Sequence, residues 1–197
     1  MLQITPVILE GKRVRLEPLR QGHAEGIWEA GRHVSIWTYM SKKMESFQDA
    51  VAFISTAIDN EAKGTELPFV IIDKRDEKII GSTRLMAISV RDKGLEIGHT
   101  WLTPSVWKTA VNTECKFLLL KHCFEALGCI RVQLKTDLRN HNSQRAIARI
   151  GGVKEGILRS HMIVQDGYVR DTVMFSILDR EWSGVEEKLQ MYLFGES

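Results

Sequence analysis

The feature that most constrains this chain is the order of patterns between Glu96 and Gly156. A strand-like segment, a proline-marked loop, a long amphipathic helix, a second strand and an Asn-rich turn follow one another there. Apolar residues recur at helical spacing over residues 113–127, and Gly128 stands where a helix C-cap belongs. Residues 130–134 then alternate between apolar and polar, which is typical of a half-buried strand. This order predicts helices packed against a mixed α/β sheet.

The remaining segments extend the same architecture. Residues 13–16 alternate as a strand, residues 21–31 are weakly helical, and Val51, Ile54 and Ile58 predict a better helix over 46–62. The other expected elements are a hairpin of 68–73 with 79–85, a strand after Gly94, a short helix at 143–150, and strands 161–164 and 168–178 around Asp166-Gly167.

Composition narrows the class of protein. The 197 residues fit one domain, 1–197, and a chain that is 44% apolar and 26% charged is typical of a globular protein. A net charge of +2 gives no electrostatic reason to expect nucleic acid or membrane partners, and no stretch reaches the roughly 18 apolar residues of a membrane helix. Cys115, Cys123 and Cys129 lack paired metal-ligand spacing, so we expect reduced thiols and no metal site. The first residues show no basic segment followed by a long apolar core, so we expect a cytoplasmic protein.

Polar residues mark the segments that precede and follow the long helix. If the strand at 96–102 alternates regularly, Glu96, Gly98 and Thr100 share one face and His99 lies on the other. The loop from Trp107 to Asn112 opens the helix, and Asn140-His141-Asn142-Ser143 follows the second strand. Glu114, in the first turn of the helix, is expected to be structural because an acidic residue there interacts favourably with the helix dipole.

These segments, in this order, resemble the GCN5-related N-acetyltransferases, and specifically the branch related to ribosomal-protein N-terminal acetyltransferases. The resemblance runs from about residue 11 to about residue 182. It implies an α/β (α+β) fold with a mixed, mostly antiparallel sheet, splayed at a V-shaped cleft, and helices on both faces. It also implies acetyl-CoA as acyl donor and, as acceptor, an amine-bearing small molecule or a protein N-terminus.

The resemblance also implies a set of donor-binding residues. The strand edge would bind the pantetheine arm through backbone groups, and the turn that opens the helix would bind the pyrophosphate. In the family this turn reads Arg/Gln-x-x-Gly-x-Gly/Ala, whereas here Trp, Ala and Asn stand at those three positions. Asn140 would contact the pantetheine arm, although an N-cap role explains it as well. The residues implied to bind acetyl-CoA are Thr100, Trp101, Leu102, Trp107, Lys108, Thr109, Ala110, Val111, Asn112, Thr113, Asn140 and Ser143.

Catalysis by direct attack of an amine on a thioester requires a base for the amine and an acid for the departing thiolate. Glu96 is the first candidate for the base, with a salt-bridged role as the alternative, and His99 is the second candidate. Ile147 stands where many family members carry the tyrosine acid, so Ser143 is the nearest hydroxyl. Gly152 likewise replaces the family's phenylalanine.

Several alternatives stay open for the acceptor side and for the activity. Aromatic residues at 28–40, with Trp28, Trp37, Tyr39 and Met40, form either an acceptor wall or core. Asp171 either binds the acceptor or fastens a hairpin. The altered turn and the missing tyrosine also fit a non-catalytic acyl-CoA-binding or sensor module, and a homodimer, with or without an active site, is a further expectation.

Overall fold

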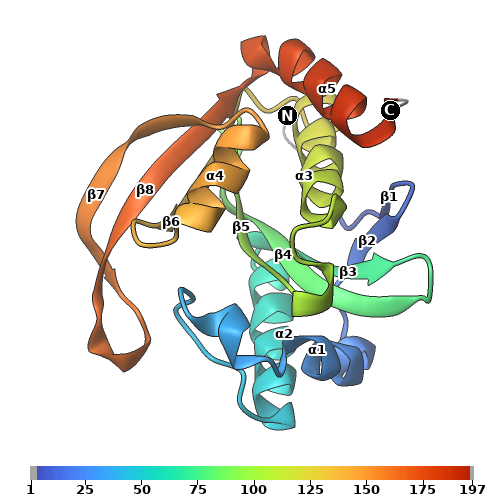
Figure 1. Cartoon of the computed structure of the whole chain (residues 1–197), viewed down its shortest axis with the longest axis vertical. Helices are drawn as coiled ribbons and strands as arrows, with labels where there is room; N and C mark the ends of the chain where they lie inside the picture. The colour runs from blue at the N-terminus through green and yellow to red at the C-terminus, as the bar shows by residue number, and fades with distance from the viewer. Residues whose placement is uncertain (1–3, 196–197) are drawn as a thin grey trace.

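One continuous sheet of eight strands organises the molecule (Figure 1). This computed structural model describes residues 4–195, so residues 1–3 and 196–197 of the predicted domain lie outside it. The strand order is β1-β2-β3-β4-β5-β6-β8-β7, and every neighbouring pair is antiparallel except β5 and β6. The strands are β1 (Leu9–Glu10), β2 (Val14–Pro18), β3 (Glu66–Asp73), β4 (Lys78–Ser89), β5 (Gly94–Leu102), β6 (Arg131–Asp137), β7 (Val153–Ile163) and β8 (Val169–Leu178).

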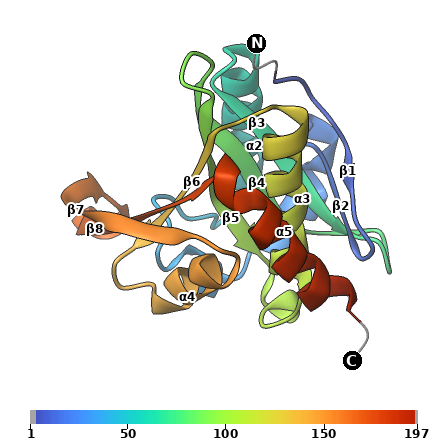
Figure 2. The ribbon, with the colours of Figure 1, turned by 90° about the horizontal axis from the view of Figure 1, so that it is seen from above.

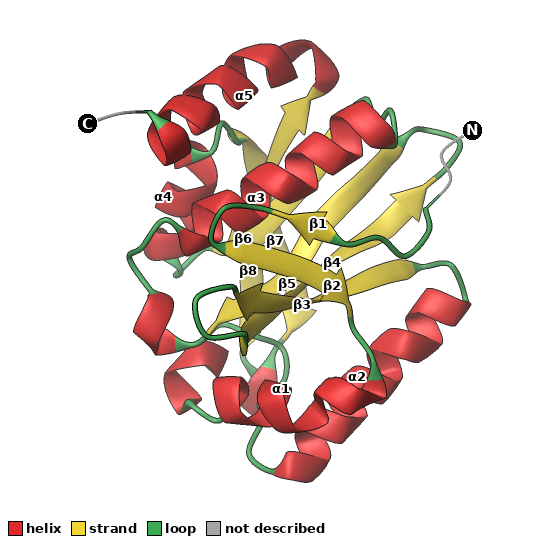
Figure 3. Cartoon of the chain, turned by 90° about the vertical axis from the view of Figure 1, so that its right-hand side faces the viewer, coloured by secondary structure: helices red, strands yellow, loops and turns green. Residues whose placement is uncertain are grey.

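Helices cover both faces of the sheet, as predicted (Figure 3). One face carries α1 and α2, and the other carries α3, α4 and α5. The α-helices are α1 (Ala24–Gly31), α2 (Phe47–Ala62), α3 (Val111–Lys121), α4 (His141–Arg149) and α5 (Asp179–Phe194). A π-helical turn, His122–Ala126, continues α3, and Gly128 follows it in the left-handed conformation, with φ +67°. No helix in the described part of the chain is long and apolar enough to cross a membrane.

Two apolar cores lie on the two sides of the sheet. The larger core joins the sheet to α3 and α5 and includes Leu85, Leu119 and Phe175, all buried. The smaller core joins the sheet to α1 and α2 and includes Ile27, Ile54 and Trp101. Burial of these side chains is the main favourable contribution to folding, at roughly 1.5–3 kcal/mol for each large apolar residue.

Most of the predicted elements are present in the structure. The helix predicted over 46–62 begins where Ser46 and Asp49 form a reciprocal capping box, with the Ser46 hydroxyl accepting from the Asp49 amide at 3.2 Å. The predicted hairpin of 68–73 with 79–85 is the antiparallel pair β3 and β4. Helix α4 begins at His141, two residues before the predicted start, because Asn140 caps it.

The strand β7 differs most from prediction. The pattern predicted strand only at 161–164, whereas β7 extends back to Val153. It is the edge strand of the sheet, and nearly all of its side chains are exposed on both faces, so no regular alternation of apolar and polar residues marks it. Two register shifts and a left-handed Ser160, with φ +47°, interrupt it further. The connection to β8 is a single 3₁₀ turn, Gln165–Gly167, in place of the predicted two-residue turn.

Candidate active site

The sheet opens where β5 parts from β6. These parallel strands pair only at Gly94 with Arg131, Leu95 with Val132 and Glu96 with Gln133. Beyond that point β6 continues along β8 to Asp137, while β5 continues along β4 to Leu102. Figure 2 shows the arm formed by β6, β8 and β7 turning away from β4 and β5. The edge of β5 from Ile97 onward therefore faces an opening, which is the splay predicted for the cleft.

A bulge lies on β5 at the start of this free edge. Gly98 pairs with Arg84 and Trp101 pairs with Ser82, so two residues of β5, His99 and Thr100, stand opposite the single Thr83. His99 takes the left-handed conformation, with φ +48°. A bulge of this kind bends the strand and reverses which side chains face each way.

The bulge corrects the prediction that Glu96 and Thr100 share a face. Before it, Ile97 packs in the larger core beneath α3, and after it Leu102 does so, while Trp101 packs in the smaller core. Thr100 consequently faces α3, and Glu96 faces the side of α1 and α2. His99, predicted to lie opposite Glu96, is the left-handed residue of the bulge and is half-buried. Burial lowers the pKa of His99.

Glu96 is a buried carboxylate held from β6. Only 1% of it is exposed, and its Oε2 accepts a hydrogen bond from Gln133 Nε2 at 3.0 Å. The Lys135 ammonium lies 3.0 Å from the same oxygen. The salt-bridged arrangement foreseen for Glu96 is therefore present, and it fixes the carboxylate at the point where the two strands part. Arg170, on β8, is buried on this same side, and burial lowers its pKa.

The Glu96 side of the opening is bridged by three segments. Gln165, in the β7–β8 connection, donates its side-chain amide to the Trp37 carbonyl. The Arg139 guanidinium lies 3.5 Å from the centre of the Tyr168 ring and 5.7 Å from that of Tyr39. Trp37 itself is buried against Trp101, with ring centres 5.4 Å apart, so the core interpretation applies to it, whereas Tyr39 contributes to the bridge.

On the α3 side, the hydroxyl groups of the turn that opens α3 form hydrogen bonds within the protein. Thr109 Oγ1 donates to the Val106 carbonyl at 2.7 Å and accepts from the Val111 amide at 3.3 Å. Thr113 is fully buried and its Oγ1 accepts from Arg149 at 3.1 Å. Both hydroxyls therefore have partners within the protein, and their contact with acetyl-CoA stays a prediction. The Val111 side chain is buried in the larger core, and its amide already donates to Thr109 Oγ1.

The backbone of this turn still presents donors. Ala110 has φ −69°, within the range open to any residue, and Lys108 is the left-handed residue, with φ +59°. The first hydrogen bond of α3 runs from the Glu114 amide to the Ala110 carbonyl, so the amides of Asn112 and Thr113 come before it and form no hydrogen bond within residues 4–195. Trp107 is 44% exposed, and its indole donates to the Leu102 carbonyl at 2.7 Å, which removes one acceptor from the free edge of β5. Backbone N–H groups at a helix start favour an anion.

Three other predicted residues have defined structural contacts. The Asn140 side chain accepts from the Ser143 amide at 3.0 Å and caps α4, which confirms the capping alternative. Asp171 accepts from the Ser160 amide at 2.7 Å, so it fastens the β7–β8 hairpin. Glu114 is buried and accepts from the Arg13 amide at 3.0 Å, as its expected structural role requires.

Several charged residues at this site were not predicted from the sequence. Lys116 and Arg170 are buried, at 6% and 7% exposed, and Arg149 joins α4 to the first turn of α3. Lys116 has a detectable signal, because it lies one residue after Cys115 and four before Leu120, within the apolar stripe of α3. A cation in such a stripe indicates a buried charge.

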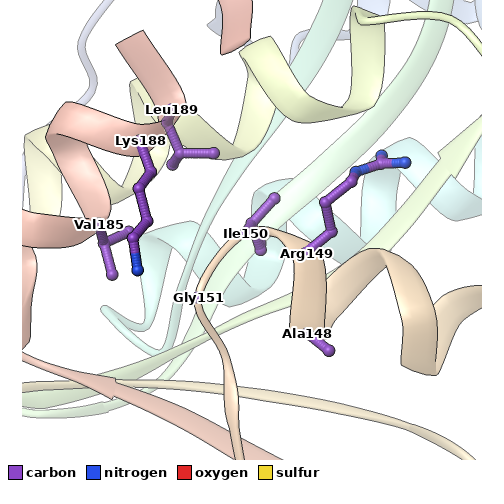
Figure 4. Close-up of a pocket in the computed structure, with 7 residues that line it drawn as sticks. All are labelled: Ala148, Arg149, Ile150, Gly151, Val185, Lys188 and Leu189. Atoms are coloured by element: carbon purple, nitrogen blue, oxygen red, sulfur yellow. The ribbon is translucent and has the colours of Figure 1, made fainter. Parts of the chain in front are cut away.

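A small pocket of about 110 Å³ lies between α4 and α5 (Figure 4). Its lining residues are Ala148, Arg149, Ile150, Gly151, Val185, Lys188 and Leu189. In Figure 4 the guanidinium of Arg149 points away from Lys188 and toward α3. The pocket contains none of the predicted donor-binding residues, so it is separate from the opening beside β5.

Comparison with known proteins agrees with this geometry. The family model for the acetyltransferase (GNAT) domain matches residues 13–153. The uncharacterized N-acetyltransferase YoaA of Bacillus subtilis is 30% identical over 175 residues, which is 87% of this chain and 96% of that protein. A crystal structure of a GCN5-related N-acetyltransferase from Brucella melitensis superposes with a TM-score of 0.89 at 32% identity, covering 95% of this chain and 85% of that one.

A more distant structure shares the fold. Mycobacterium smegmatis RimJ in complex with CoA-disulfide matches with a TM-score of 0.80 at 21% identity, over 95% of this chain and 92% of that one. The splayed sheet, the helix that opens beside it and these matches lead to one assignment. The chain belongs to the GCN5-related N-acetyltransferase (GNAT) superfamily and is an N-acetyltransferase.

Proposed function

We propose that this enzyme transfers an acetyl group from acetyl-CoA to a primary amine, on a protein N-terminus or a small molecule, by direct attack of the amine. The observation that carries the proposal is the free edge of β5, which begins directly after the buried carboxylate of Glu96. Unpaired backbone groups along this edge suit an amide-rich ligand such as pantetheine. The relative crystallised with CoA-disulfide shares this fold and supports a CoA donor.

The donor-binding role falls mainly on backbone groups. The free edge from Ile97 to Leu102 would bind the pantetheine arm, and the amides of Asn112 and Thr113 would bind the pyrophosphate. Lys108, exposed on the turn, adds a positive charge near those amides. Asn140 and Ser143, at the start of α4, complete the proposed acetyl-CoA site. Asn140 would both cap α4 and contact the pantetheine arm.

Glu96 is the proposed base. Its carboxylate faces the side bridged by the β7–β8 connection, and we assign that side to the acceptor amine. The neutral amine attacks the thioester carbonyl carbon and passes its N–H proton to Glu96 as the carbon–nitrogen bond forms, so no covalent acyl-enzyme is needed. The Lys135 ammonium beside Glu96 also favours the neutral form of an amine bound nearby, because like charges repel.

Two measurements test the proposal. Calorimetry should show acetyl-CoA binding, and thiol release should appear with at least one member of a panel of primary amines that includes peptides with free N-termini. The same peptides with blocked N-termini serve as the control and should release no thiol. Failure of acetyl-CoA and of every other acyl-CoA to bind would refute the proposal.

A sensor module is the second candidate. Ala110 and Asn112 depart from the family's turn, and Ile147, buried in the larger core, occupies the position of its tyrosine. Binding of acetyl-CoA with no thiol release across the amine panel would favour this function over catalysis.

A further inference from the structure

The proposed reaction requires a proton donor for its leaving group. When the carbon–sulfur bond breaks, the electron pair passes to sulfur, and the thiolate must take up a proton. Ile147 cannot supply one, because it is apolar and packed in the larger core. Ser143 carries a hydroxyl, which is a far weaker acid than an ammonium group.

Lys116 is an ammonium group at the free edge of β5. It belongs to the second turn of α3, is 6% exposed, and its Nζ donates to Thr100 Oγ1 at 2.5 Å. Thr100 Oγ1 in turn lies 2.8 Å from Thr83 Oγ1 on β4. Thr100 belongs to the bulge, so the ammonium is held beside the residues where β5 has lost its β6 neighbour.

The structure gives this cation no carboxylate partner. Within residues 4–195, Thr100 supplies its hydrogen-bond acceptor, and no carboxylate lies within ion-pair distance of Nζ. A buried charge without an opposite charge is costly, and the neighbouring stripe positions on α3, Cys115, Leu119 and Leu120, are apolar. An apolar side chain at position 116 would stabilise the fold better than a buried cation. The cation therefore points to a role in the reaction.

Its electrostatic environment suits proton donation. Burial lowers the pKa of Lys116 to about 8, against the opposing effects of Cys115 on its own helix and Glu96 on β5. A cysteine thiol in water has a pKa of about 8.5. A donor and an acceptor with similar pKa values exchange a proton readily, and at neutral pH Lys116 is largely protonated.

We propose that Lys116 is the catalytic acid that protonates the CoA thiolate. This inference rests on the proposed function. The amine nitrogen forms a bond to the carbonyl carbon, the carbon–sulfur bond breaks, and sulfur takes a proton from Lys116 Nζ. Glu96, on the opposite face of β5, takes the proton lost by the amine. Solvent then returns a proton to Lys116 and removes one from Glu96, so the net products are the acetylated amine and CoA thiol.

The first test is kinetic and uses an acceptor found in the amine panel. Lys116→Met should lower kcat by about 10²-fold, since a positioned acid contributes roughly 10²–10⁴-fold, while acetyl-CoA affinity is largely kept. In the wild-type enzyme kcat should fall as the pH rises through about 8, where Lys116 loses its proton, and Lys116→Met should lack this decline. Lys116→Arg retains the charge but not the acidity, so it should stay slow.

Two further variants separate this role from a structural one. Lys121→Met, on the same helix, removes a lysine paired with Glu186 and should leave kcat unchanged. Thr100→Val removes the acceptor of the ammonium hydrogen bond, so the alkaline decline in kcat should move to lower pH.

The stability of Lys116→Met shows whether the lysine serves the fold. This variant should unfold at no lower temperature than wild type, because an apolar side chain of similar size replaces an unpaired buried charge. Wild-type kcat with the alkaline decline intact in Lys116→Met, or full activity in Lys116→Arg, would overturn the proposal.

The second test needs no turnover. The thiol of bound CoA is titrated through the ultraviolet absorbance of its thiolate, and it should ionise at lower pH in wild type than in Lys116→Met, because the ammonium stabilises the thiolate. Equal titration in both proteins would place Lys116 away from the sulfur and refute the inference, whether or not an acceptor is found. Thiol release in wild type together with equal titration would refute only the role of Lys116. Absence of CoA binding would refute the proposed function itself.

Discussion

The two faces of β5 hold opposite charges by different means. On one face the Glu96 carboxylate is fixed by Gln133 and Lys135, both from β6. On the other face the Lys116 ammonium reaches Thr100 from α3 and has a hydroxyl as its partner. Glu96 is thus neutralised by its surroundings, whereas Lys116 keeps an unbalanced charge inside the protein.

The bulge at His99 and Thr100 supplies the hydroxyl partner of Lys116. In a regular strand, residues 96 and 100 would face the same way, and Lys116, which α3 places on the other face, would lose its hydrogen bond to Thr100. The extra residue reverses the alternation, so the carboxylate faces the side of α1 and α2 while Thr100 faces α3. The bulge thereby gives the proposed acid a hydrogen-bond acceptor on β5, on the face opposite the proposed base.

Removal of the Glu96 charge should have the largest effect on activity. We expect Glu96→Gln to lower kcat/KM by about 10²–10³-fold with acetyl-CoA affinity retained, because the amide keeps the shape but not the basicity of the carboxylate. Steady-state kinetics and calorimetry measure the two quantities. The control is Glu114→Gln, a buried carboxylate that accepts from Arg13 on the far side of α3 and should leave kcat unchanged. Full activity in Glu96→Gln would show that water or another residue accepts the proton of the amine.

Displacement of Glu96 without loss of its charge should have a smaller effect. A Cβ added at Gly98 would lie 2.6 Å from the Met86 sulfur and 2.9 Å from Glu96 Oε1, so the carboxylate or the methionine must move. We expect Gly98→Ala to lower kcat by roughly 10- to 100-fold, since a shift of about 1 Å in a catalytic group can have this cost. Gly94→Ala, on the same strand, meets nothing closer than 3.7 Å and should behave as wild type. Equal kinetics in the two variants would show that the position of Glu96 is not critical.

Replacement of His99 separates the shape of the bulge from the chemistry of the imidazole. Glycine adopts the φ of +48° without strain, so His99→Gly should keep the bulge and lose less than tenfold in kcat, which is below the contribution of a general base. His99→Val, a β-branched residue at the same backbone conformation, should lose both stability and activity. Thermal unfolding and thiol release measure both. A decrease of more than 100-fold in kcat for His99→Gly, with its unfolding temperature unchanged, would indicate that His99 is the base.

The arrangement of elements was readable from the sequence, because strands and helices in the interior carry regular apolar spacing. The strands β3 and β4, the helix α2 and the break after α3 at Gly128 all follow from such spacing or from a capping residue. The strand β7 was largely missed because it is exposed on both faces, so its sequence carries no alternation.

The sequence did not predict which face of the sheet each residue of the site occupies. A bulge has no fixed sequence signature when a histidine occupies the left-handed position, so regular alternation placed Thr100 on the wrong face. The internal use of Thr109, Thr113 and Asn140 likewise depends on partners that only the folded chain brings together. Lys116 is the exception, since its position in the apolar stripe of α3 is visible in the sequence itself.

The smallest effect is expected on the donor side, where the sequence departs most from the family pattern. Ala110→Gly restores the family's central glycine, yet we expect acetyl-CoA affinity to stay within about twofold, since Ala110 has φ −69° and gains nothing from glycine there. The left-handed residue of this turn is Lys108, two positions earlier, and Lys108→Gly should raise the unfolding temperature while weakening binding by loss of a charge. Calorimetry on both variants separates backbone shape from charge. Binding at least tenfold tighter in Ala110→Gly would mean that the turn must change conformation to hold the pyrophosphate, and that the alanine restricts this change.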